Sequence, residues 1–276
     1  MATKTSIQVL PVQLASEPSR SSSERVLGMM DLFTEATPSW TVEQMAKVLG
    51  LARTTAYRYA KTLTTAGLLT SLNAGVYILG PRIIELDRQI RLNDPLLRTA
   101  PPLMNAVRKR AGGIQLLCVY YGDHVLCIHD VREDKDVPSG YDRGRPFPLF
   151  RGGPSRVILA HLPQRQQKDL MLHHAAEIAR AGLGQDWNSF NRNLKAIRKQ
   201  GYFAARGELN VNTYGISAPI MHGKGLAGSF TIGRRLEDLA AKEIPRLIAL
   251  TVDTAAKISQ AIQSIQAESN DKAAVQ

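Results

Sequence analysis

The chain has 276 residues, 44% of them hydrophobic, which suffices for two folded domains or one large domain. Its net charge of +11 and its pI near 9.8 favour a polyanionic partner, either nucleic acid or an anionic membrane surface. No apolar run is long enough for a membrane-spanning helix, the N-terminal segment lacks the apolar core of a secretory signal, and two cysteines exclude a disulfide scaffold. We therefore expect a protein of the reducing cytoplasm.

The first ordered element is expected after a disordered tail at residues 1–21, which ends in a run rich in Ser, Pro and Glu. Apolar residues at helical spacing predict a helix from Ser23 to Phe33. The serines at its start are suitable N-caps. Its expected apolar stripe consists of Val26, Leu27, Met30 and Phe33.

Two helices joined by a tight turn are predicted between Thr41 and Ala66. Thr41 and Gln44 have the spacing of a capping box, in which each side chain bonds to the other residue's backbone N–H. Gly50 supplies the left-handed residue that ends the first helix. The second helix is expected to run from about Ala52 to Ala66, where Gly67 stops it.

Two short β-prone runs follow, Leu68–Leu72 and Val76–Leu79, with a turn at residues 73–75. Helix, turn, helix and hairpin predict a winged helix–turn–helix, whose second helix enters the DNA major groove. The alternative is a small helical subdomain with a solvated polar face. The residues predicted to contact DNA are Arg53, Thr54, Thr55, Tyr57, Arg58, Lys61 and Asn73.

Arg58 and Lys61 are expected to make different contacts with DNA. The guanidinium of Arg58 has the fork that fits guanine O6 and N7, whereas the Lys61 ammonium is a point charge suited to phosphate. The wing itself, residues 64–81, carries no charge. Any contact from the wing is therefore expected from Asn73, backbone N–H groups or Tyr77.

A linker helix is predicted over Arg82–Leu92, between Gly80-Pro81 and Asn93-Asp94-Pro95. Its apolar side is too exposed for a small winged domain. We therefore expect it to pack against a second copy of the chain, which would set the spacing of two DNA-binding helices. A further helix is expected to reach about Ala111, with Pro101-Pro102 either starting or interrupting it.

The C-terminal half predicts strands flanked by helices, several of the strands joined as hairpins, which favours an α+β domain with a mainly antiparallel sheet. The β-prone runs are Ile114–Tyr120, His124–Val131, Tyr202–Leu209, Tyr214–Met221 and Leu226–Ile232. Helices are expected at Ser155–Leu162, Arg165–Ala181, Trp187–Lys199 and Leu236–Ile265, before a disordered tail at residues 268–276.

A two-residue turn at Gly122-Asp123 places Cys118 directly opposite Cys127 and puts His129 on the same face of the sheet. Two interpretations stay open. Thiolates and an imidazole at this spacing can bind zinc, or the thiols can pair, but no fourth ligand is evident. Free cysteines more often serve as small buried apolar residues, and we predict no metal site.

Four stretches of the chain, two in each half, carry a family resemblance. They are residues 24–33, residues 49–69, residues 148–163 and residues 197–220. In that order they resemble the first helix, the turn and recognition helix, the effector-domain loop and helix, and the late strand pair of the IclR family of bacterial transcription regulators. Two departures bear on the ligand. Ser155 precedes Arg156 where the family usually has Gly, and the preceding loop is Arg151-Gly-Gly-Pro154.

The resemblance implies a winged helix–turn–helix domain at residues 22–80, a linker helix at 81–95 and a GAF-like effector-binding domain at 96–267. It also implies operator DNA, a small-molecule effector such as an organic or aromatic acid, and homodimers or homotetramers as partners. Carried over by position, the expected effector-binding residues are Arg151, Gly152, Gly153, Pro154, Ser155, Thr213, Gly215 and Ser217. The free N–H groups at the start of a helix near Ser155 suit an anion. At least one of Arg143, Arg145 and Arg151 is expected to bind a carboxylate, although each taken singly is more typical of a solvated loop charge.

Two other classes of function are weighed against a ligand-controlled regulator. One is an enzyme acting on a small acid, with the N-terminal helices as an oligomerisation arm. The sequence shows no nucleophile–base–acid set and no Gly-rich phosphate motif, so we expect no catalytic residues, no cofactor and no enzyme activity. The other is a nonspecific binder of nucleic acid or membrane surfaces, and salt-sensitive, sequence-specific DNA binding would separate it from a regulator.

Overall fold

The computed structural model describes residues 21–133 and 141–274, and the chain divides into two compact units between Asn93 and Asp94. Most of the N-terminal tail expected at residues 1–21 lies outside the described residues. The two units are described separately below.

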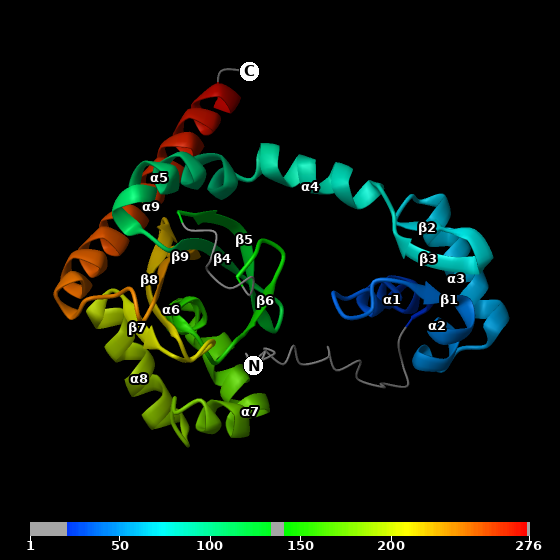
Figure 1. Ribbon diagram of the computed structural model, residues 1–276, viewed down its shortest axis with the longest axis horizontal. Helices are drawn as coiled ribbons and strands as arrows, with labels where there is room; N and C mark the ends of the chain where they lie inside the picture. Colours follow the sequence, from blue (N-terminus) through cyan, green and yellow to red (C-terminus); the bar gives the residue numbers. More distant parts are fainter. Residues whose placement is uncertain (1–20, 134–140, 275–276) are drawn as a thin grey trace. The chain divides into compact units, whose positions relative to one another are not determined.

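The N-terminal unit contains a winged helix–turn–helix, in which helices α1 to α3 pack with a small antiparallel sheet (Figure 1). Its sheet has the strand order β1-β3-β2. The elements up to the wing are α1 (Ser22–Gly28), η1 (Met30–Leu32), β1 (Trp40–Thr41), α2 (Val42–Leu49), α3 (Arg53–Thr65), β2 (Leu69–Ser71), η2 (Asn73–Gly75) and β3 (Val76–Leu79). The core of the unit includes Met29, Met45, Ala56, Tyr59 and Leu63.

Local sequence signals fix the ends of α2 and α3. The Thr41 hydroxyl accepts from Gln44 N at 3.3 Å, and the Gln44 side chain accepts from Thr41 N at 2.8 Å, so the predicted capping box is confirmed. Gly50 ends α2 in the left-handed conformation, with φ of 62°. Helix α3 begins and ends within a residue of its predicted limits.

Two features of this unit differ from expectation. The first helix is shorter than predicted, because the chain changes after Gly28 to a 3₁₀ turn, and fully buried Met29 replaces exposed Leu27 in the core. Apolar spacing alone does not distinguish these two arrangements. Strand β1 was not predicted either, since two residues are too few for a periodic signal; Trp40 pairs with Tyr77 and adds a third strand to the wing.

Helix α4 (Arg82–Asn93) follows the wing and belongs to the N-terminal unit. None of its residues is buried. Ile84 is 73% exposed and Ile90 is 52% exposed, and Leu86 and Leu92 are also exposed. As predicted, this helix therefore exposes large apolar side chains in a single chain.

The C-terminal unit is built on a six-stranded sheet with the order β6-β5-β4-β9-β8-β7, in which every pair of neighbours is antiparallel. The strands are β4 (Ile114–Tyr121), β5 (His124–Arg132), β6 (Pro146–Pro148), β7 (Phe203–Arg206), β8 (Thr213–His222) and β9 (Gly225–Arg235). The predicted α+β class with a mainly antiparallel sheet is confirmed. Strand β6 was not predicted, and its two prolines suit the edge of the sheet, where no ladder N–H is needed.

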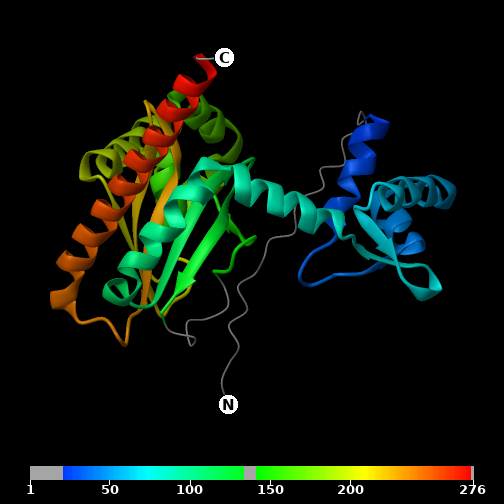
Figure 2. The same ribbon diagram turned by 90° about the horizontal axis from the view of Figure 1, so that it is seen from above.

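Helices cover both faces of this sheet (Figures 1 and 2). Helices α5 (Pro95–Ala111) and α9 (Ile244–Ala274) pack side by side on one face, around a core that includes Phe230 and Leu247. The other face is covered by α6 (Gly153–His161), with α7 (Gln164–Arg180) and α8 (Trp187–Gln200) outside it.

Prolines explain two differences in these helices. Helix α5 starts at Pro95 behind an Asp94 cap and continues through Pro101 and Pro102, so this pair neither starts nor interrupts it. Helix α9 begins at Ile244, after a 3₁₀ turn, and not at Leu236 as predicted. Pro245 lies in its first turn, where the missing N–H costs nothing. The described backbone of α9 also continues past Ile265.

A β-bulge changes the predicted geometry around the cysteines. Tyr121 pairs with His124 and Cys118 pairs with Cys127 as expected, but Leu117 pairs with His129 because Ile128 is an extra residue in β5. Partners in a ladder share a face, so His129 lies on the α5 and α9 face with Leu117, opposite the two cysteines. The prediction that the three residues share one face was therefore wrong.

Candidate DNA-binding surface and effector cavity

Helix α3 has one buried face and one exposed polar face. Ala56, Tyr59, Ala60 and Leu63 are buried against the rest of the N-terminal unit. The predicted DNA-contacting residues of α3 lie on the other side and are exposed, with Thr55 half-buried. The helix thus presents hydroxyl, phenol, guanidinium and ammonium groups on one surface.

The arginines of this surface differ in how they are held. Arg53 forms an exposed ion pair with Glu43 of α2 at 2.7 Å. The guanidinium carbon of Arg58 lies 5.7 Å from the centre of the Tyr59 ring, which is within cation–π range. Arg58 and Lys61 have no ion pair in the described part of the chain. Their charges therefore remain available to an anionic partner, and Asn73 is exposed in the wing.

A mostly apolar cavity of about 40 Å³ lies in the C-terminal unit, between the sheet and the start of α6. Five predicted effector residues line it: Gly152, Gly153, Pro154, Thr213 and Gly215. Further walls come from Ile114, Leu116, Tyr141, Ala205, Glu208, Leu209, Tyr214, Thr231, Gly233 and Arg234. The cavity thus brings together two stretches that are distant in the sequence, the residues around the start of α6 and those at the start of β8.

Three predicted residues do not line the cavity. Ser155 is fully buried in the first turn of α6, and its hydroxyl has no hydrogen-bond partner among the described residues. Ser217 is buried behind Gly153 and shares a 2.8 Å hydrogen bond with Thr231. Arg151 is exposed and donates to the backbone oxygen of Glu208 at 2.7 Å. These residues support the walls of the cavity and do not form them.

Sequence reasoning missed several residues that line the cavity. The Tyr141 hydroxyl lies 3.3 Å from the Thr213 hydroxyl, and burial raises the pKa of Tyr141, an effect that this hydrogen bond partly offsets. Leu209 packs against Gly152, where an added Cβ would lie 2.6 Å from the Leu209 side chain. No local pattern marks these residues, because their neighbours come from distant parts of the chain.

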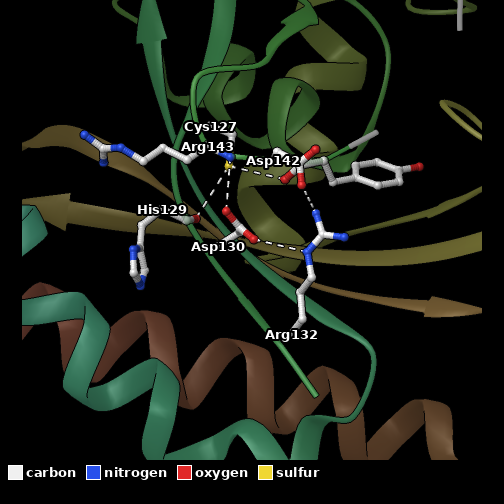
Figure 3. A network of polar contacts seen from close by, with 7 residues as sticks. Cys127, His129, Asp130, Arg132, Asp142 and Arg143 are labelled. Carbon is white, nitrogen blue, oxygen red and sulfur yellow. Dashed lines mark hydrogen bonds and ion pairs between the residues drawn. The ribbon is translucent and has the colours of Figure 1, made fainter. Parts of the chain in front are cut away.

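The segment that holds Tyr141 is fixed to β5 by a network of polar contacts (Figure 3). Arg132 bonds to Asp130 at 3.2 Å and also pairs with Asp142, while Arg143 N donates to the Asp130 carboxylate at 3.0 Å. Cys127 Sγ lies 3.7 Å from the Tyr141 backbone oxygen. The network positions a wall of the cavity, and the Arg143 guanidinium donates to the Ile128 backbone oxygen. Arg143 and Arg145 do not line the cavity.

The start of α6 already carries an internal carboxylate. Glu208 Oε2 accepts from Gly152 N at 2.8 Å and from Arg156 Nε at 2.9 Å. Gly152 is the N-cap residue of α6 and has φ of 92°. Because it is a glycine, it has no side chain that could cap the helix. The carboxylate from the β7–β8 segment therefore takes the place that a capping side chain or a bound anion occupies at other helix N-termini.

The cysteines form no cluster with other metal ligands. Cys118 and Cys127 are free and fully buried, and burial raises the pKa of the Cys118 thiol, with its neighbour Cys127 adding to the effect. Within residues 21–133 and 141–274, no group of three or more His, Cys, Asp and Glu side chains is placed to hold a metal ion. In Figure 3 the His129 imidazole points away from Cys127. The same residues include no helix long and apolar enough to span a membrane.

A winged helix–turn–helix and an α+β unit with a small cavity, joined in one chain, define the class of ligand-responsive transcriptional regulators. Residues 22–72 match the IclR helix-turn-helix domain, and residues 92–260 match the C-terminal domain of bacterial transcriptional regulator IclR. The chain belongs to the IclR family. Its N-terminal unit is the DNA-binding domain and its C-terminal unit the effector-binding domain, so it belongs with regulators and not with enzymes of small acids.

Similar proteins agree with this assignment. The chain is 23% identical over 237 residues to the HTH-type transcriptional regulator KipR of Bacillus subtilis, covering 86% of this chain and 94% of KipR. It is 26% identical over 243 residues to the glycerol operon regulatory protein of Streptomyces coelicolor, covering 87% and 95%. An IclR homologue from Microbacterium hydrocarbonoxydans, solved in complex with 4-hydroxybenzoate, has the same fold, with a TM-score of 0.72, 20% identity, and coverage of 88% and 100%.

Proposed function

We propose that this protein binds operator DNA through the exposed face of α3 and that a small organic acid in the C-terminal cavity controls this binding. In this proposal residues 22–80 form the DNA-binding domain and residues 96–267 the effector-binding domain. Residues 81–95 form the helix that links the two domains. DNA binding in a bacterium takes place in the cytoplasm, which also suits two free buried thiols.

The observation that carries the DNA-binding part is the exposed polar face of α3. In a helix–turn–helix the first residues of the second helix meet base edges. Thr54 lies in the first turn of α3, and Arg58 and Lys61 are exposed further along the helix. Arg58 carries an exposed guanidinium suited to guanine, and Lys61 an exposed ammonium suited to phosphate. Asn73 extends from the wing toward the sugar–phosphate backbone in this proposal.

The observation that favours a small organic acid is the combination of apolar walls with a few polar groups in the lining of the cavity. Leu116, Pro154 and Ala205 supply apolar surface, and the Tyr141 and Thr213 hydroxyls offer hydrogen bonds. This composition is typical of small-molecule sites. The relative from Microbacterium hydrocarbonoxydans binds 4-hydroxybenzoate, and we propose an aromatic or other small carboxylic acid for this chain.

We propose further that two chains associate through α4. Isolated exposed apolar residues are common, but α4 exposes four large ones within nine residues, Ile84 to Leu92, and buries none. Packing two copies together would bury this surface and give a twofold arrangement of DNA-binding helices. Light scattering at micromolar concentration tests this: a dimer or tetramer is expected, and Ile84→Glu with Ile90→Glu should give monomers. A monomeric wild-type protein would refute this part of the proposal.

The experiment that tests the function uses a labelled duplex from upstream of the gene that encodes the chain. Fluorescence anisotropy should show binding that exceeds binding to a scrambled duplex, weakens with salt, and changes when carboxylic acids from a metabolite panel are added. Equal affinity for both duplexes, with no response to any acid, would contradict the proposed function.

A further inference from the structure

The cavity is too small for the effector class proposed above. An apolar cavity that accepts benzene measures about 150 Å³, whereas this one measures about 40 Å³. Protein interiors do not expand without moving side chains or backbone. A ligand the size of an aromatic acid therefore requires that one wall of the cavity move.

Glu208 and Leu209 form a wall of the cavity outside regular secondary structure, which three hydrogen bonds of Glu208 and the packing of Leu209 join to residues 151–156. They belong to the short segment between β7 and β8, outside the sheet ladder. Leu209 covers Gly152 through side-chain packing, and Glu208 is held to the start of α6 through its carboxylate. Withdrawal of these two side chains would enlarge the cavity toward α6.

Arg156, in contrast, is held in place independently of Glu208. Its second nitrogen donates to the Ala181 backbone oxygen at 2.8 Å, and its guanidinium carbon lies 5.2 Å from the centre of the Phe203 ring. Its side chain is only 12% exposed. If Glu208 withdrew, the guanidinium would keep its position and its charge would lack a partner, which is costly at this depth.

The same first turn of α6 holds a second group without a partner. The fully buried Ser155 hydroxyl makes no hydrogen bond with any described residue. Such a group is destabilising unless a ligand or water satisfies it. A fixed guanidinium, the Gly152 N–H and a buried hydroxyl thus lie in one short segment beside the cavity, and the first two are occupied by an internal carboxylate.

We propose that Arg156 anchors the carboxylate of the effector and that Glu208 is an intramolecular competitor for this position. An acid that enters the cavity replaces Glu208 on Arg156 and Gly152 N, and the Glu208–Leu209 wall withdraws to make room. This inference rests on the proposed control by an organic acid and assigns its specificity to Arg156. A neutral ligand of the same shape cannot replace Glu208, because it does not compensate the Arg156 charge.

Isothermal titration of the full chain with benzoate and 4-hydroxybenzoate, each paired with its neutral amide, tests the assignment. Wild-type protein should bind an acid more tightly than its amide. Arg156→Gln should weaken binding of the acid by about tenfold or more, the range expected for losing a charged hydrogen bond. Glu208→Gln should strengthen binding of the acid several-fold, since the competing charge is gone.

Two further variants make the result specific. Arg198 donates to the Ala160 backbone oxygen at the other end of α6, so Arg198→Gln removes a half-buried arginine without touching the cavity and should bind the acid as wild type does. Arg151→Gln tests the arginine that the sequence favoured. A loss of acid binding in Arg151→Gln with wild-type affinity in Arg156→Gln would overturn the assignment.

The failure of the inference and that of the proposed function are distinguishable. If wild-type protein binds neither acid and no acid of the metabolite panel, control by an organic acid is refuted, and the anchor with it. If wild-type protein binds an acid and Glu208→Gln binds it equally or more weakly, only the competitor model is refuted. The Glu208→Gln result decides the matter even if Arg156→Gln does not fold, which its melting temperature will show.

Discussion

The exposed face of α3 and the effector cavity differ in the length of chain from which each is built. The DNA-binding face takes its polar side chains from one helix of thirteen residues. The position of a residue along this helix therefore determines the face on which its side chain lies. The cavity takes its walls from residues between Ile114 and Arg234, on strands, connecting segments and the start of α6. Residues of the first surface can be assigned by periodicity, whereas those of the second depend on which distant segments the fold brings together.

The largest expected effect concerns specificity at the DNA-binding face. Arg58→Ala should reduce the preference for operator over scrambled DNA by roughly 5- to 150-fold, because a bidentate arginine–guanine contact contributes about 1–3 kcal/mol of discrimination. Anisotropy titrations with both duplexes give this ratio. The contact of Arg58 with the Tyr59 ring predicts in addition a loss of stability of no more than about 1 kcal/mol.

The same variant separates a DNA-binding role from a structural one. If Arg58 only stabilises α3 through Tyr59, the variant will melt at a lower temperature while the ratio of operator to scrambled affinity stays at the wild-type value. Arg25→Ala is the matched comparison, because it removes an exposed arginine of α1 that is not among the predicted DNA contacts. An unchanged ratio for folded Arg58→Ala would show that another residue reads the bases.

The next expected effect is on stability and concerns the wall of the cavity. Gly152→Ala should destabilise the protein by about 2 kcal/mol, because an alanine with φ near 92° is strained and its Cβ would displace Leu209. Gly182→Ala is the control: its φ of 70° is also left-handed, but the space around it is open, so a loss of about 1 kcal/mol is expected. Chemical denaturation measures both. Equal losses would mean that Leu209 moves without cost.

These comparisons also show how far the sequence could define the fold and the sites. The capping box at Thr41, the left-handed Gly50 and the pairing of Cys118 with Cys127 follow from neighbours in the chain or from one turn, and all three were predictable. The bulge at Ile128 was not, since no residue type requires it, and it moved His129 to the other face.

At the cavity, the resemblance to a family located the region but not the roles. Gly152, Gly153 and Thr213 line the cavity, and their role in effector binding stays a prediction. The arginine beside the start of α6 that is held ready for an anion is Arg156 and not exposed Arg151. That distinction depends on contacts with Phe203 and Ala181, which lie far along the chain and leave no local pattern.

A smaller effect is expected from Lys61→Ala, which sharpens the contrast between affinity and specificity within α3. The variant should bind operator and scrambled DNA more weakly to the same extent, since phosphate contacts carry no base information. The slope of log affinity against log salt should fall by about one unit, as expected for one lost phosphate contact. A selective loss of operator binding would instead assign base recognition to Lys61.

The smallest expected effect is a pH dependence at the far end of α6. Burial lowers the pKa of His161 below its usual 6.5, against a hydrogen bond to the Val157 backbone oxygen that raises it, and Arg198 lowers it further. As pH falls below about 6.5, the unfolded chain takes up this proton before the folded chain does, so stability declines until the folded pKa is passed. His161→Gln should remove this part of the decline in urea denaturation at pH 7.5, 6.5 and 5.5. His173→Gln, which removes an exposed histidine of α7, is the matched control. A wild-type slope in His161→Gln would show that other groups account for the acid sensitivity of the protein.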